Sequence, residues 1–211
     1  MRGMDAARVT VLRELLAGSG WLERTQGFAG ALRGAVTRPS AAPGGLLLVG
    51  ADAEEPWHLA AHLDDEAAWS GLPALSPTLL RRTVPPGAPP HLSVPLRRLE
   101  QAGRGETVLV VAPGGSDGGL LERVHDARRS GATILALQAD LGTADGELRG
   151  LAHEALTVPD GADSPDFDIV QHLVSAAAGE PSTPAQRGRL LRGVLARAMD
   201  RLTATPPPMR W

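Results

Sequence analysis

The sequence contains no cysteine, no lysine, no asparagine and no tyrosine. The missing cysteine excludes disulfides and thiolate chemistry, and the missing lysine excludes a Schiff base and a P-loop lysine. All 21 basic residues are therefore arginines. The codons of Lys, Asn and Tyr are rich in A and T, so a GC-rich bacterial genome explains their absence without a functional reason.

Aromatic residues, long apolar runs and a strong charge of either sign are also scarce. Aromatics make up 3% of the 211 residues, and the net charge is -3 with the arginines dispersed. This charge argues against nucleic-acid binding. No apolar run reaches the roughly 18 residues of a membrane span, and the N-terminus shows no signal-peptide pattern. We expect one cytoplasmic domain, long enough to bury a proper core.

The order of apolar segments predicts an α/β fold. Helical spacing predicts two N-terminal helices, over 5–17 and 21–37. Short unbroken apolar runs predict buried strands. In chain order, these are expected at 46–49, within 73–80, and at 107–111, 132–137 and 155–158. The later helices are expected at 55–68, 94–101, 120–130, 144–152, 168–178 and 183–202.

This alternation of strands and helices predicts a three-layer α-β-α sandwich with a mainly parallel sheet, Rossmann-like in character. In such sheets, ligands bind beyond the carboxyl ends of the strands. The expected site therefore lies at two loops, 50–56 and 112–119. We expect the chain to be organised as N-terminal helices (1–38), an α/β core (39–180), a C-terminal helix (181–204) and a loose, Pro-rich tail (205–211).

Three segments around these loops fit one family pattern. Residues 58–63 read HLAAHL, where the family has a helix of the type His-hydrophobic-Ala-Ala-Glu-Leu, and residues 71–74 read GLPA, a sequence that often precedes its next strand. The stretch 108–137 fits the family's second loop, helix and strand without a gap. On these motifs, residues 28–178 resemble the sugar isomerase (SIS) family, and within it the phosphoheptose isomerases. The resemblance implies the SIS fold, a homodimer or homotetramer, and a sugar-phosphate ligand.

Both expected ligand loops depart from the family pattern. The first reads Gly-Ala-Asp-Ala-Glu-Glu instead of Gly-Asn-Gly-Gly-Ser. The second lacks the expected hydroxyls at Ala112 and Gly114. Backbone N–H groups of the glycines remain for a phosphate nest, but carboxylates in both loops would repel a dianion. By the resemblance, the ligand-binding positions are Gly50, Asp52, Gly114, Gly115, Ser116 and Asp117. The repelling carboxylates are those of Asp52, Glu54, Glu55 and Asp117.

The expected catalytic residues are His62 and His172. Aldose–ketose isomerisation needs a general acid and a general base. The resemblance places the family's glutamate at His62 and its late-helix histidine in 168–178, where His172 lies. A second register matches His172 to an earlier family histidine and puts Ala177 at the catalytic position. Either register changes at least one catalytic partner, so we expect a pseudoenzyme that binds a ligand or a protein partner. The alternative is an active isomerase that uses both histidines.

His58 and His62 share a helix face because they are four residues apart. This spacing can bind zinc, and His172 would complete a three-histidine metal site. The competing interpretation is that half-buried histidines on an Ala-rich helix have no ligand role. Trp57 and Trp69, at the two ends of this helix, are expected to pack in the core or at an interface, as is Trp21. A further hypothesis is an interaction protein that docks through its proline-rich segments, 85–90 and 205–211.

Overall fold

A computed structural model describes residues 11, 14, 16–51, 55–88, 93–140, 146–161 and 164–180, all of which fall within one compact unit, Met1–Pro181. Most of the expected helix at 5–17 lies outside the described residues. The expected helix at 183–202, the tail and Asp52 lie outside them as well. In the part of the chain that is described, no helix has the length and apolar character needed to cross a membrane.

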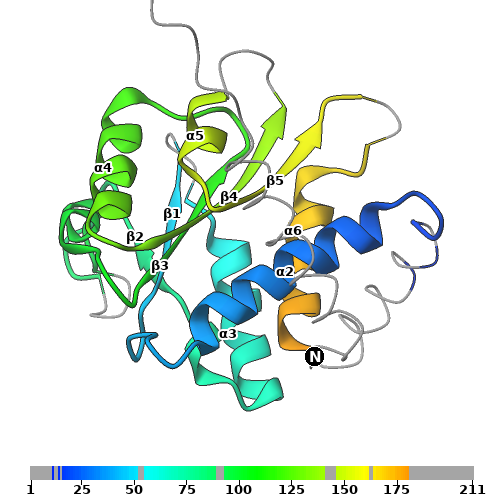
Figure 1. The fold of residues 1–211 in the computed structure, drawn as a ribbon, viewed down its shortest axis with the longest axis horizontal. Helices are drawn as coiled ribbons and strands as arrows, with labels where there is room; N and C mark the ends of the chain where they lie inside the picture. Colours follow the sequence, from blue (N-terminus) through cyan, green and yellow to red (C-terminus); the bar gives the residue numbers. More distant parts are fainter. Residues whose placement is uncertain are drawn as a thin grey trace, which may run out of the picture. The chain divides into compact units, whose positions relative to one another are not determined.

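The centre of the fold is an all-parallel sheet of five strands in the order β2-β1-β3-β4-β5 (Figure 1). The first strand in the sequence pairs with a neighbour on each side, and this register places its Leu48 between Leu79 and Leu109. The predicted α/β fold with a parallel sheet is therefore confirmed. The strands are β1 (Leu46–Gly50), β2 (Thr78–Leu80), β3 (Thr107–Ala112), β4 (Thr133–Asp140) and β5 (Glu154–Pro159).

Helices cover both faces of the sheet, which explains the unbroken apolar runs of its strands. Leu46 and Leu48 belong to the core on one face, whereas Leu47 and Val49 belong to the core on the other. The first face is covered by α2 (Trp21–Thr37), α3 (Trp57–Ser70), η1 (Pro73–Leu75) and α6 (Phe167–Gly179) (Figure 1). The second is covered by η3 (Leu96–Gln101), α4 (Gly118–Arg129) and α5 (Gly146–Leu151).

Several element ends differ from the sequence prediction for identifiable reasons. Helix α3 begins at Trp57 rather than at 55, because Pro56 takes the position before the first helical residue. Helix α4 begins at Gly118 rather than at 120, because the carboxylate of Asp117 caps it there. The helix expected at 94–101 is a 3₁₀ helix, η3. Such short helices are frequent as connectors.

The three tryptophans expected to pack in the core or at an interface differ in exposure. Trp21 is 6% exposed and belongs to the core, as predicted. Trp57 and Trp69 are 38% and 43% exposed. Core packing is therefore wrong for both ends of α3, and the interface interpretation remains for them.

The strand order creates a crevice at one edge of the sheet. From β1 the chain passes through α3 to β2 on one side of β1, and β3 then pairs with the other side of β1. The connections after β1 and β3 therefore run to opposite faces, α3 to one and α4 to the other. Ligands of open α/β sheets bind at such a switch point, beyond the carboxyl ends of the strands.

Candidate ligand site

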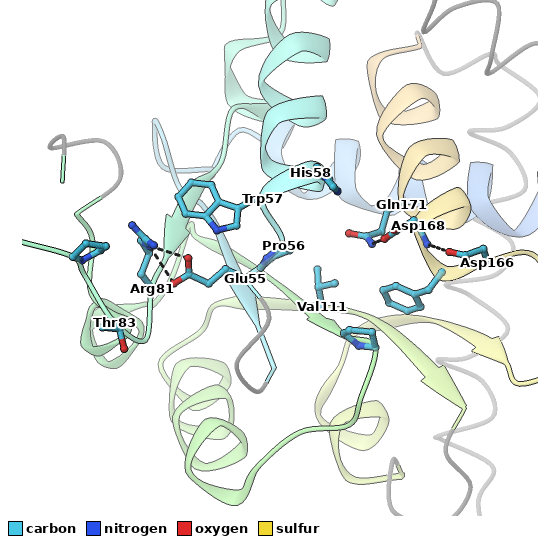
Figure 2. A pocket seen from close by; sticks show the side chains of 13 residues that line it. Glu55, Pro56, Trp57, His58, Arg81, Thr83, Val111, Asp166, Asp168 and Gln171 are labelled. Atoms are coloured by element: carbon cyan, nitrogen blue, oxygen red, sulfur yellow. Dashed lines mark hydrogen bonds and ion pairs between the residues drawn. The ribbon is translucent and has the colours of Figure 1, made fainter.

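A cavity of about 860 Å³ opens at this switch point (Figure 2). Its walls come from the start of α3, the segment after β2, the end of β3 and the start of α6. Its volume lies in the range of small-molecule sites. The lining residues are Glu55, Pro56, Trp57, His58, Arg81, Thr83, Pro85, Val111, Pro113, Asp166, Phe167, Asp168 and Gln171.

One wall of the cavity is built around the guanidinium of Arg81. Its Nε donates to both carboxylate oxygens of Glu55, at 3.1 and 2.9 Å. The guanidinium carbon also lies 4.6 Å from the ring centroid of Trp57, a cation–π contact. The Arg81 and Glu55 side chains are only 13% and 17% exposed. Two partners and partial burial therefore fix Arg81 in one position against the Trp57 ring.

The opposite wall is the first turn of α6, as Figure 2 shows. Asp166 caps this helix by accepting a hydrogen bond from the backbone N–H of Asp168 at 2.8 Å. The Asp168 carboxylate in turn accepts from the side-chain amide of Gln171 at 2.9 Å. Gln171 is 8% exposed, so a buried amide holds a carboxylate at the cavity wall. This arrangement offers acceptor oxygens to a ligand.

The second expected loop is closed by its own aspartate. Asp117 Oδ1 accepts from the backbone N–H of Leu120 at 2.8 Å, and Oδ2 accepts from Arg82 at 2.5 Å. The hydrogen bond from the Leu120 N–H is the largest cause that lowers the pKa of Asp117 below its usual 3.8. Burial partly offsets it by raising the pKa, and the hydrogen bond and charge of Arg82 lower the pKa again. The N-terminus of α4 is therefore already occupied by an anion.

The other expected ligand positions that the structure describes lie at the same edge of the sheet but are not among the described residues that line the cavity. Gly50 ends β1 and is buried. Gly114 is exposed, and Gly115 has a φ of 95°, which favours glycine in this turn. The Oγ of Ser116 is buried without a hydrogen-bond partner among the described residues. The loop at 112–119 thus serves as a turn into α4, with one hydroxyl left unsatisfied.

The two expected catalytic histidines touch each other. The rings of His62 and His172 lie with centroids 4.2 Å apart, at an interplanar angle of 59°. They come from α3 and α6, and neither lines the cavity. His58, one turn before His62, does line it and is exposed.

In the described part of the chain, no three His, Asp or Glu side chains come together as a group that could hold a metal ion. The zinc site expected from His58, His62 and His172 stays a prediction.

Sequence reasoning missed most of the residues that line the cavity. Arg81 is one of the dispersed arginines of the sequence, and it reaches the cavity because it directly follows β2. Asp166, Phe167 and Asp168 directly precede or begin α6 and form a capping pattern. The sequence signal that could identify these residues is their position immediately after a strand or at the start of a helix, because such positions lie at the carboxyl edge of a parallel sheet.

The sheet order and the cavity define an α/β protein with a cavity at the switch point of a parallel sheet. No family model matches the sequence, and no curated protein matches it at a significant level. Among solved structures, it is similar to a candidate sugar-binding protein from Salmonella typhimurium LT2, with 17% identity and a TM-score of 0.48. The match covers 90% of this chain but only 53% of the Salmonella protein.

Two further solved structures show likeness at the same level. NanR of Vibrio vulnificus, in complex with ManNAc-6P, is 13% identical with a TM-score of 0.48, over 84% of this chain and 62% of that one. The sugar isomerase domain of an RpiR transcription factor from Sphaerobacter thermophilus is 15% identical with a TM-score of 0.47, over 82% of this chain and 86% of that one.

Proposed function

We propose that this protein is an SIS-type domain that binds a small carbohydrate ligand in the switch-point cavity and has no isomerase activity. The family assignment rests on the motifs at 58–63, 71–74 and 108–137. The ligand site rests on the cavity itself, which combines two aromatic residues with hydrogen-bonding side chains. Sites of this composition are typical for small polar ligands.

The observation that carries the loss of catalysis is the position of the two histidines. General acid–base catalysis requires the catalytic atoms within hydrogen-bond reach of the substrate. His62 and His172 contact each other between α3 and α6 instead of lining the cavity. The carboxylates that do line it are engaged: Glu55 with Arg81, Asp166 with the backbone N–H of Asp168, and Asp168 with the side chain of Gln171.

Ligand binding is tested by thermal shift with a panel of sugars and sugar phosphates, followed by calorimetry on each hit. A ligand that binds only the folded state raises the melting temperature. Trp57→Ala is expected to abolish the shift, because Trp57 lines the cavity. Trp69→Ala is the matched control at the other end of α3, where the residue lies outside the cavity lining. A panel without any shift, or a shift that survives Trp57→Ala, contradicts the proposal.

An active isomerase is the second candidate, favoured by the contact between His62 and His172. The two side chains expected to act as acid and base are brought together from helices far apart in sequence. Aldose–ketose isomerisation moves the proton at the sugar's second carbon, so activity would exchange it with deuterium from the solvent. NMR of sugar phosphates in deuterated water tests this directly. Exchange that disappears in His62→Ala would replace the binding proposal with the enzymatic one.

The zinc site and the oligomer stay predictions of the sequence. Metal analysis of the purified protein tests the first, with His58→Ala as the variant expected to lose any bound zinc. Analytical ultracentrifugation tests the homodimer or homotetramer. A protein partner would be sought by cross-linking of the intact chain. None of these three results bears on the cavity, because the residues that line it come from one chain.

A further inference from the structure

The charges of the cavity indicate the class of ligand that it takes. Among the described lining residues, the carboxylates are those of Glu55, Asp166 and Asp168, and the guanidinium is that of Arg81. Arg81 is paired with Glu55. The two aspartates on α6 form no ion pair with a described cation. The wall that faces Arg81 and Trp57 in Figure 2 is therefore anionic.

At the start of α4 and of α6, the chain's own carboxylates take the positions where a phosphate would dock. Phosphates bind at helix N-termini because the first backbone N–H groups are unpaired there. At α4, Asp117 accepts the N–H of Leu120 and is held by Arg82. At α6, Asp166 accepts the N–H of Asp168. Helix α3 has no side-chain cap, but the Glu55 carboxylate lies directly before it.

The remaining features of the cavity suit a sugar without a phosphate. Carboxylate oxygens accept hydrogen bonds from hydroxyl and ammonium groups. Trp57 and Phe167 come from the two opposite walls and offer apolar ring surface. A dianion in the same place would lie beside two carboxylates in a partly enclosed space, where like charges repel more strongly than in water.

We infer that the cavity takes an unphosphorylated sugar, with a protonated amino sugar bound best, and rejects the corresponding sugar phosphate. This inference rests on the proposed function, because it assumes that the cavity binds a carbohydrate. The two aspartates of α6 are the selecting residues, and Asp117 closes the alternative position at α4.

The test is calorimetry on the full chain with matched pairs of hexoses, hexosamines and heptoses, each with and without its phosphate. In every pair that binds, the unphosphorylated member is expected to bind at least about tenfold more tightly, a difference readily resolved by calorimetry. The double variant Asp166→Asn, Asp168→Asn should lose this preference. Asparagine keeps the cap and the shape. Asp126→Asn, an exposed carboxylate on α4 at the other face of the sheet, is the control and should keep the preference.

The possible outcomes separate the inference from the proposed function. Tighter binding of the phosphorylated members overturns the inference and leaves carbohydrate binding in place. Retention of the preference in the double variant also overturns it, because the aspartates would not be the selecting groups. If no sugar of either kind binds, the proposed function fails and the inference fails with it. Melting curves of each variant establish that it is folded.

Discussion

Arg82 and Asp117 form an ion pair at 2.5 Å although 35 residues separate them in the sequence. The neighbouring Arg81 forms the corresponding pair with Glu55. Two successive arginines after β2 therefore bind one acidic residue from each of the loops that follow β1 and β3. Carboxylates that the sequence suggested as sources of repulsion are held by cations at the edge of the sheet.

Replacement of Asp117 is expected to separate its roles as helix cap and ion-pair partner. Asp117→Ala should destabilise the fold by about 1 kcal/mol, the usual cost of losing an N-cap. Asp117→Ser keeps a capping oxygen and loses only the ion pair with Arg82. It should cost a few tenths of a kcal/mol, because an exposed ion pair contributes little to stability. Chemical denaturation of the three proteins measures the differences. Equal stability of the alanine and serine variants would show that capping is not the main role.

The contribution of Asp117 should also depend on pH. Its pKa in the folded state lies below the usual 3.8, chiefly because the N–H of Leu120 donates to the carboxylate. The charged form therefore favours folding: its stabilisation is fully present above pH 3.8 and is lost as the pH falls through the folded-state pKa. The stability gap between the native chain and Asp117→Asn should close over this acidic range. A gap that widens there would contradict the assignment.

Arg81 is expected to control the environment of Trp57. Arg81→Ala removes the cation stacked on the ring and leaves the Glu55 carboxylate without its guanidinium. We expect a loss of about 1–3 kcal/mol, the cost of an unsatisfied charged group, and a red shift of the Trp57 emission as water reaches the ring. Subtraction of the Trp57→Phe spectrum isolates this signal from the other tryptophans. Arg97→Ala, at a neighbouring arginine pair outside the cavity lining, should leave the emission unchanged.

Two glycine substitutions in helices should have opposite effects on stability. A Cβ at Gly179, the last residue of α6, would overlap the carboxylate of Glu66 on α3. Because this carboxylate is the far end of a flexible side chain, it can move aside, and Gly179→Ala should cost about 0.5–1.5 kcal/mol, the range for a displaced rotamer. Gly34, in the last turn of α2, has open space at its Cβ. Gly34→Ala should stabilise by about 0.5–1 kcal/mol through reduced chain entropy. Thermal denaturation of both variants decides the signs.

Substitution of the touching histidines should spare ligand binding. Because His62 and His172 do not line the cavity, His62→Ala and His172→Ala are each expected to keep the ligand Kd within about twofold, the scatter usual for changes outside a site. His58→Ala, one turn closer to the opening of the cavity, should weaken binding. Calorimetry with the best ligand of the panel makes the comparison. Loss of binding in His62→Ala would place the ligand deeper between α3 and α6.

The sheet could be predicted from the sequence because its strands are covered on both faces. The apolar runs at 46–49 and 107–111 carry this signal locally, and their alternating residues enter the two cores. The edge strand β2 has only three residues, so its bounds were predicted less sharply. The 3₁₀ form of η3 depends on the turn geometry after Pro95, which periodicity does not encode.

The site could be predicted only in position, not in its contacts. The carboxyl edge of the sheet follows from the strand–helix order, and so do the loops that begin there. The pairing of Arg81 with Glu55 depends on β2 lying next to β1, a long-range relationship that one sequence does not show. The contact of His62 with His172 likewise depends on how α3 packs on α6.

The short edge strand β2 couples the two loops at the cavity mouth. Among the described strands it pairs with β1, and it ends directly before the arginines that bind Glu55 and Asp117. The first of these, Arg81, also forms a bridge to Pro95. If β2 frays, both loops lose their cations in the same event. Edge segments with few hydrogen bonds open at a lower free energy than the whole domain. Hydrogen exchange of the β2 amides would then report on the local unfolding that opens the cavity mouth. A bound ligand would slow that exchange by holding the strand in place.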